Sequence, residues 1–231
     1  MPKNLSVEQK ANWLEICQDL IEDLKLSQIF FDKVTAGDES WVFDYDPETK
    51  RQSAEWHTKS PHLPKKVCIS RSRMKTMIIV SFDSSDIVRK EFVLPGQTFN
   101  HACYKDILER LRKWVQRVRT DIADDRVLHH HKAPVHTAVS IREFLEKKNI
   151  SLLPHPPYSP DLAPCDFCLL FKLKSKLKSH HFRTMENIQK IVTDELHTLK
   201  ENDFRYCYDQ LKKRWNHCIN SQGLHFEGDN L

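Results

Sequence analysis

The chain has 231 residues, of which 39% are hydrophobic and 29% are charged, and its net charge is +4 at neutral pH. This composition is that of a globular protein and excludes a disordered chain. No apolar run reaches the roughly 18 residues that a membrane span requires, and Met1 is not followed by the core of a signal peptide, so we predict no membrane partner. The small basic excess favours a polyanionic partner only weakly.

The seven cysteines are scattered along the chain, at positions 17, 68, 103, 165, 168, 207 and 218. A disulfide framework is not expected at this size, so we predict reduced thiols in a cytosolic or nuclear protein. Cys165 and Cys168 form a lone C-x-x-C without a second pair, for which packing is the expected role rather than metal binding. The four glycines indicate helices with a modest sheet rather than an all-β barrel.

The first half of the chain predicts one helix followed by strands. Ser6 and Gln9 form a capping box, and apolar residues at helical spacing predict a helix over 6–26. We further predict a β-prone run over 40–45, a short strand over 52–57, a basic loop over 58–75, and a hairpin made of the buried strand 77–82 with 87–94.

The second half alternates between strand and helix. We predict helices over 99–119, 137–148, 164–180, 185–200 and 203–219, with short strands over 126–130 and 150–153. A hairpin followed by this alternation is typical of an α/β domain built around a mixed sheet. The chain shows no internal repeat, so a single domain is the simplest interpretation.

Three residues that could bind metal lie at the predicted ends of elements. Asp38 comes just before a predicted strand, His131 ends one, and Asp166 opens a helix. Phosphodiester chemistry with two Mg²⁺ or Mn²⁺ ions requires ligands that converge from separate elements on one cleft. Each residue also has a structural interpretation, because Asp38 follows Gly37 as a turn residue would and Asp166 complements a helix dipole. Spacing alone does not decide between them.

Three strings closely resemble the catalytic blocks of mariner transposases, a family of DNA transposases. They are Ala-Gly-Asp-Glu-Ser-Trp at 36–41, His-His-His-Lys-Ala-Pro-Val-His-Thr at 129–137, and the proline-rich His-Pro-Pro-Tyr-Ser-Pro-Asp-Leu-Ala-Pro-Cys-Asp-Phe at 155–167. The third string is the most specific. The tail, with Trp-Asn-His-Cys at 215–218 followed by Gly223 and Phe-Glu-Gly-Asp at 226–229, resembles the family as well, so the resemblance covers essentially the whole chain.

The resemblance implies an RNase H-like fold, with a central mixed sheet and helices on both faces, and a site that uses Mg or Mn to cut and join DNA. The first and third catalytic aspartates of the family match Asp38 and Asp166, which are the implied metal ligands. The second position, an aspartate in the family, is occupied by His131, and the asparagine after it is replaced by Lys132. Its spacing is retained, because 34 residues lie between His131 and Asp166.

These two replacements predict that strand cleavage is absent or severely impaired. A carboxylate is a hard anionic ligand suited to Mg²⁺, whereas a neutral imidazole suits softer metals, and Lys132 adds a positive charge next to the site. The run of three histidines also admits a zinc interpretation, since His129 and His131 would share one face of a strand. Spacing places no third zinc ligand.

Two basic stretches are the candidates for contact with DNA phosphates, and a solvated helix face is the alternative for each. The first contains Lys105, Arg110, Arg112, Lys113, Arg117 and Arg119, and the second contains Lys172, Lys174, Lys176, Lys178 and Arg183. By resemblance, the loop over 58–75 corresponds to a segment that clamps a partner subunit, which implies a homodimer.

The resemblance also implies a domain organisation. Residues 1–5 resemble the linker that precedes the family's catalytic domain, so we predict that 1–26 are a remnant of the linker and its helix, that 27–231 form the catalytic domain, and that the helix-turn-helix DNA-binding region is absent. We expect a nuclear protein without a small-molecule substrate and without methyltransferase activity. The alternative is a non-catalytic nuclear module that binds DNA or protein and keeps the fold for its surface.

Overall fold

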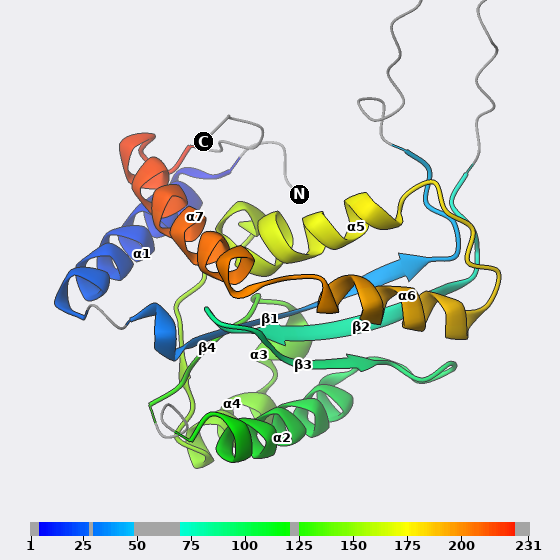
Figure 1. The fold of residues 1–231 in the computed structure, drawn as a ribbon. Coiled ribbons are helices and arrows are strands. Elements are labelled where there is room, and N and C mark those ends of the chain that lie inside the picture. Colours follow the sequence, from blue (N-terminus) through cyan, green and yellow to red (C-terminus); the bar gives the residue numbers. More distant parts are fainter. Residues whose placement is uncertain (1–4, 28–29, 49–69, 121–124, 225–231) are drawn as a thin grey trace, which may run out of the picture.

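The computed structural model describes residues 5–27, 30–48, 70–120 and 125–224, and its centre is a five-stranded sheet in the order β3-β2-β1-β4-β5 (Figure 1). The strands are β1 (Val34–Phe43), β2 (Lys75–Phe82), β3 (Ile87–Phe92), β4 (Val127–His129) and β5 (Ser151–Leu152). β1, β2 and β3 pair antiparallel, whereas β4 runs parallel to β1 and β5 runs parallel to β4. The predicted mixed sheet is therefore confirmed.

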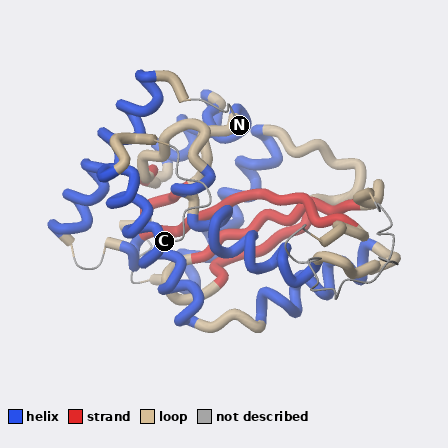
Figure 2. The backbone as a smooth tube through the Cα atoms, turned by 90° about the horizontal axis from the view of Figure 1, so that it is seen from above, coloured by secondary structure: helices blue, strands red, loops and turns tan. Residues whose placement is uncertain are grey.

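Helices cover both faces of this sheet, as predicted (Figure 1). One layer contains α1 (Val7–Leu26), α5 (Phe171–Leu177), α6 (Met185–His197) and α7 (Glu201–Asn220), and the other contains α2 (His101–Val118), α3 (Pro134–Thr137) and α4 (Val139–Lys147). Figure 2 shows helices lying in front of the strands when the molecule is seen from above. Short helical segments are η1 (Phe31–Lys33), η2 (Pro160–Leu162) and η3 (Cys165–Leu170), of which η3 is a π-helix.

The start of β1 differs from the prediction. The strand begins at Val34, not at residue 40, so Asp38 lies inside the strand and not just before it. The alternative interpretation of Asp38 as a turn residue after Gly37 is wrong, because Gly37 also lies inside the strand. A Cβ atom at Gly37 would lie 2.9 Å from the Oγ of Ser81 on the neighbouring β2, so only glycine fits without a shift.

The other elements agree with their predictions to within a few residues. The capping box of α1 is present, with Ser6 Oγ accepting from the backbone N–H of Gln9 at 3.2 Å and Gln9 Oε1 accepting from the N–H of Ser6 at 2.9 Å. The helix predicted over 137–148 is divided into α3 and α4. The strand predicted over 52–57 and most of the basic loop 58–75 lie outside the described residues. No helix in the described ranges combines the length and apolarity needed to cross a bilayer.

Each face of the sheet has its own apolar core. The larger core joins α1, α5, α6 and α7 to one face, and its fully buried members include Trp13, Tyr208 and Trp215. The smaller core joins α2 and α4 to the other face around Leu108 and Ile141. Because α1 contributes to the larger core, it packs as an integral part of this fold, while the domain boundary placed at residue 27 stays a prediction.

The expectation that all the cysteines are reduced is wrong. Cys168 in η3 and Cys207 in α7 form a disulfide that joins two segments 39 residues apart. Both residues are buried, and sequence reasoning missed the pair because only the packing of α7 against η3 brings them together. Among the described residues Cys17, Cys103, Cys165 and Cys218 are free thiols.

Candidate functional site

The fold brings Asp38, His131 and Asp166 together, as predicted. Asp38 lies in the middle of β1, His131 lies two residues after β4, and Asp166 lies in the first turn of η3. β4 pairs parallel with β1 so that His129 is opposite Ala36, which carries His131 to the level of Asp38. One ligand atom from each of the three residues lies within 4.8 Å of the other two.

His131 occupies the space between the two carboxylates. Its Nε2 atom lies 2.9 Å from Oδ2 of Asp166 and 3.6 Å from Oδ2 of Asp38. Burial opposes a charge on the imidazole, but the hydrogen bonds and charges of Asp166 and Asp38 outweigh it and raise the pKa of His131 to about 10. At neutral pH the residue is therefore an imidazolium ion that neutralises part of the acidic site.

Asp38 is the most buried of the three residues. Its desolvation raises the pKa of the carboxyl, and the hydrogen bond and charge of His131 offset part of that rise. Asp166 is more exposed, with 33% of its side chain accessible to solvent. The three residues thus form an acidic site with a deep carboxyl group, a shallow carboxyl group and a cation between them.

A second pair of residues, Glu39 and His136, positions the segment that carries His131. Glu39 follows Asp38 on β1 and therefore points to the opposite face of the sheet. There its Oε1 atom lies 3.0 Å from Nε2 of His136 in α3, while Nδ1 of His136 donates to the backbone carbonyl of His131 at 2.8 Å. Burial lowers the pKa of His136, but the bond to Glu39 reverses that effect and raises it, which suits an imidazolium with two donors.

Both residues stand in the sequence strings from which Asp38 and His131 were identified, but no role was predicted for either. The only available signal was the alternation of a strand, which separates neighbours such as Asp38 and Glu39 onto opposite faces.

The neighbouring histidines are neutral and structural in their contacts. Ser159 Oγ donates to the carbonyl of Pro156 at 2.6 Å, so it accepts from Nε2 of His155 at 3.0 Å. Nδ1 of His155 then accepts from Nε2 of His129, also at 3.0 Å. Burial lowers the pKa of His129 to about 3 and that of His155 well below its ordinary value.

The zinc interpretation gains no support from this arrangement. Nε2 of His129 is bonded to His155, and among the described residues the group that could hold a metal consists of Asp38, His131 and Asp166. Cys165 is buried, and the pKa of its thiol is raised well above its ordinary value by that burial, as expected of a packing residue.

The proline-rich segment before Asp166 is held from both terminal helices. Trp13 of α1 donates its indole N–H to the carbonyl of Pro157 at 2.9 Å. Arg214 of α7 donates to the carbonyl of Asp161 at 3.2 Å and lies over the ring of Phe167, 4.2 Å from its centroid. The position of Asp166 thus depends on helices at both ends of the chain.

The two predicted basic stretches lie on opposite faces of the sheet, in α2 and around α5 (Figure 1). Lys105 and Lys113 on α2 are exposed. Glu109 lies 3.6 Å from Arg112 and 3.9 Å from Lys113, so it offsets part of their charge. Arg117 lies over the ring of Trp114. The α2 stretch keeps free positive charge, but not all of its residues face solvent.

The α5 stretch follows directly after η3, which carries Asp166, so in the sequence it is closer to Asp166 than the α2 stretch is. Lys172 is paired with Asp203 at 2.9 Å and Lys176 with Glu195 at 2.7 Å. Lys174 is half-buried. These pairs reduce the charge that this stretch presents to a polyanion.

The donor set of the site suits a divalent cation only in part. Two carboxylates that converge from β1 and η3 are the hard oxygen ligands that Mg²⁺ and Mn²⁺ prefer. The imidazolium of His131 lies between them and offers N–H donors where a metal needs a lone pair. Metal binding at this site therefore competes with the proton on His131.

Comparison with known proteins identifies the family to which this chain is similar. Residues 50–189 match the model of the DDE superfamily endonucleases. The Mariner Mos1 transposase of Drosophila mauritiana is 31% identical to the chain over 233 residues, an alignment that spans 98% of this chain and 66% of that protein. The human histone-lysine N-methyltransferase SETMAR is 25% identical over 98% of this chain, which corresponds to 33% of its own length.

Solved structures agree with this result. A crystal structure of the Mos1 mariner paired-end complex with Mn superposes with a TM-score of 0.89 at 30% identity, over 98% of this chain and 66% of that one. The crystal structure of the catalytic domain of Mos1 mariner transposase superposes with a TM-score of 0.81 at 28% identity, over 98% of this chain and all of the other. The expected RNase H-like fold is confirmed, and the chain belongs to the DDE superfamily of endonucleases, in the family of mariner transposase catalytic domains.

Proposed function

We propose that this chain is a mariner-type catalytic domain whose DNA strand cleavage is absent or severely impaired. The observation that carries the proposal is the position of His131, whose Nε2 atom is hydrogen-bonded or ion-paired to both Asp38 and Asp166. An imidazolium there lies between the two carboxyl groups and removes the third negative ligand that phosphodiester chemistry with two metals uses.

Asp38 and Asp166 are the residues that would hold Mg²⁺ or Mn²⁺. A bound ion at this position supplies Lewis-acid activation of the attacking oxygen and stabilises the leaving oxygen. Mn²⁺ fits the mixed set better than Mg²⁺ because it accepts an imidazole ligand more readily. Glu39 and His136 act as positioning residues, because they fix the backbone of the segment that carries residue 131.

DNA is the proposed partner. Solved relatives include Mos1 complexes with transposon-end DNA, and α2 and α5 of this chain carry basic residues on both sides of the sheet. We place Lys105, Arg112, Lys113 and Arg117 in one contact surface and Lys172, Lys174 and Lys176 in the other. A homodimer formed through the loop 58–75 and a nuclear location are further parts of the proposal.

The test is metal-dependent nicking of supercoiled plasmid, measured for the natural chain and for the double variant His131→Asp, Lys132→Asn, in Mg²⁺ and in Mn²⁺. We expect the double variant to nick and the natural chain to remain at background. A triple variant that also carries Asp38→Asn should lose the recovered activity, which separates the site from a contaminating nuclease. Equal nicking by the natural chain and the double variant would refute the proposal.

A non-catalytic DNA-binding module is the second candidate. It is favoured by the same ion pairs, since neutralising the carboxylates reduces the repulsion that a phosphate backbone meets at the acidic site. Salt-sensitive DNA binding that is unchanged by removal of divalent metal would support this candidate.

A further inference from the structure

A pocket of about 240 Å³ lies outside the acidic site, between the C-terminal half of α2, the start of β4 and the turn between α4 and β5. Three basic side chains line it, namely Arg112, Arg126 and Lys148, together with Gln116 and Asn149. No carboxylate stands among the lining residues in the described ranges.

Arg126 is the unusual member of this set because it is buried, with 5% of its surface exposed. Its Nη1 atom has no hydrogen-bond partner within the described part of the chain. Burial lowers the pKa of its guanidinium to about 10, so the group remains charged at neutral pH. A buried cation without an acceptor is costly, and proteins satisfy such groups with a bound anion or with water.

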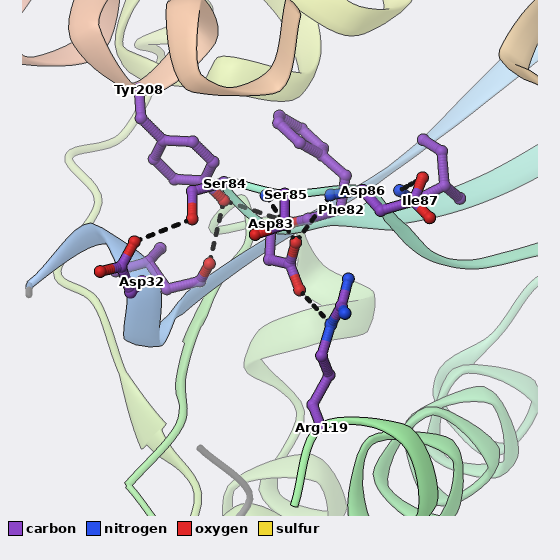
Figure 3. Close-up of polar contacts among 10 residues, drawn as sticks. Asp32, Phe82, Asp83, Ser84, Ser85, Asp86, Ile87, Arg119 and Tyr208 are labelled. Carbon is purple, nitrogen blue, oxygen red and sulfur yellow. Dashed lines mark hydrogen bonds and ion pairs between the residues drawn. The ribbon is translucent and has the colours of Figure 1, made fainter. Parts of the chain in front are cut away.

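The charge of Asp83 acts on Arg126, but the Asp83 carboxylate is already hydrogen-bonded to other groups (Figure 3). Its Oδ1 atom accepts from the backbone N–H groups of Ser85 and Asp86 at 2.8 and 2.9 Å, and its Oδ2 atom accepts from Nε of Arg119 at 3.0 Å. Asp83 thus attracts Arg126 without being bonded to it. The guanidinium of Arg126 is left to face the pocket.

Arg112 adds a second incompletely bonded guanidinium. Its Nε atom is buried without a hydrogen bond, because Glu109 Oε2 lies 3.6 Å away, beyond good hydrogen-bonding distance. Lys148 is half-buried at the end of α4, and Asn149 adopts the left-handed backbone conformation with φ of 51°. Three cations thus line one small pocket. Of the two carboxylates near them, Glu109 is ion-paired with Arg112 without a hydrogen bond to its Nε, and Asp83 is bonded to Arg119.

We propose that Arg112, Arg126 and Lys148 form an anion site that binds a phosphate group. Planar guanidinium groups bind phosphate oxygens through paired hydrogen bonds, and a lysine adds a point charge. The pocket lies at the N-terminal end of β4, whereas His131 follows its C-terminal end, so the two sites are separate. The phosphate belongs either to a DNA backbone or to a free phosphate or small phosphate ester. Binding at this pocket does not depend on whether the acidic site is active.

The test is the melting temperature of the full chain in metal-free buffer, titrated with inorganic phosphate against chloride at constant ionic strength. A specific site gives a saturable rise, since a ligand that binds only the folded state stabilises it in proportion to the logarithm of its concentration. We expect Lys148→Gln and Arg112→Gln each to weaken phosphate binding about tenfold, the worth of one charged hydrogen bond. Lys147→Gln, on the same turn but outside the pocket, is the matched control and should bind as the natural chain does.

A short DNA duplex added as a competitor distinguishes the two sources. If the duplex displaces phosphate, the site takes a DNA backbone; if it does not, the site takes a free phosphate or a small ester. The proposal is overturned if phosphate gives no saturable stabilisation, or if Lys147→Gln weakens binding as much as Lys148→Gln. Arg126→Gln should abolish binding, and the Lys148 and Arg112 variants keep the test decisive if that buried variant does not fold.

Discussion

Replacing His131 with aspartate should convert the acidic site from a poor site for divalent metal into a strong one. In the natural chain the imidazolium of His131 lies between the carboxyl groups of Asp38 and Asp166 and offsets negative charge there. In His131→Asp the same space holds three carboxylates, which match the preference of Mg²⁺ and Mn²⁺ for anionic oxygen.

The size of the effect follows from the proton that a metal must displace. The pKa of His131 is about 10, so at pH 7 the solution lies three pH units below the pKa of the proton that a metal must displace from Nε2. At about 1.4 kcal/mol per unit this corresponds to about 4 kcal/mol, or roughly a thousandfold in affinity. Since 23% of the side chain is exposed, solvent screening reduces the gain, and we expect Mn²⁺ to bind His131→Asp about 100-fold to 1000-fold more tightly.

The assay is direct Mn²⁺ binding, followed by isothermal titration calorimetry or by the electron paramagnetic resonance signal of free Mn²⁺. Measurements at pH 7.0 and 8.5 separate the causes, because proton competition should strengthen binding to the natural chain about tenfold per pH unit and leave His131→Asp almost unchanged. Lys132→Asn alone is the control for the neighbouring charge. Affinities that agree within about threefold between the natural chain and His131→Asp, with no pH dependence, would refute the reasoning.

Three further predictions concern stability. Folding raises the pKa of His131 from 6.5 to about 10, so its ion pairs stabilise the fold fully below pH 6.5 and are lost as pH rises through 10. Between these two pH values, urea titrations should show that the natural chain loses about 1 kcal/mol of unfolding free energy per pH unit relative to His131→Gln. Reducing the Cys168–Cys207 disulfide, which spans 39 residues, should lower the free energy of unfolding by about 4 kcal/mol, whereas dithiothreitol should have no such effect on a Cys168→Ser, Cys207→Ser variant. Gly223→Ala should destabilise the fold by more than Gly96→Ala in thermal melts, since both glycines have positive φ but only at Gly223 would a Cβ atom lie 2.3 Å from the carbonyl oxygen of Lys10; equal losses would exclude the clash as the cause.

Local patterns in the sequence determined most of the elements of this protein. The capping box at Ser6, the apolar periodicity of the helices and the continuous apolar run of β2 each depend on residues close together in the chain, so they could be interpreted without a structure. Asp38, His131 and Asp166 were identified from strings that resemble a family, and the fold then placed their ligand atoms within 4.8 Å of one another.

Contacts between distant segments were decided only by the tertiary structure. Asp38 was placed before the strand because the sequence does not show that Gly37 lies across from Ser81 of β2. Cys168 and Cys207 became a disulfide through the packing of α7 on η3. The same physical reason applies to the protonated state of His131: its pKa is set by two carboxylates from other elements and by burial, and none of these can be read from its neighbours in the chain.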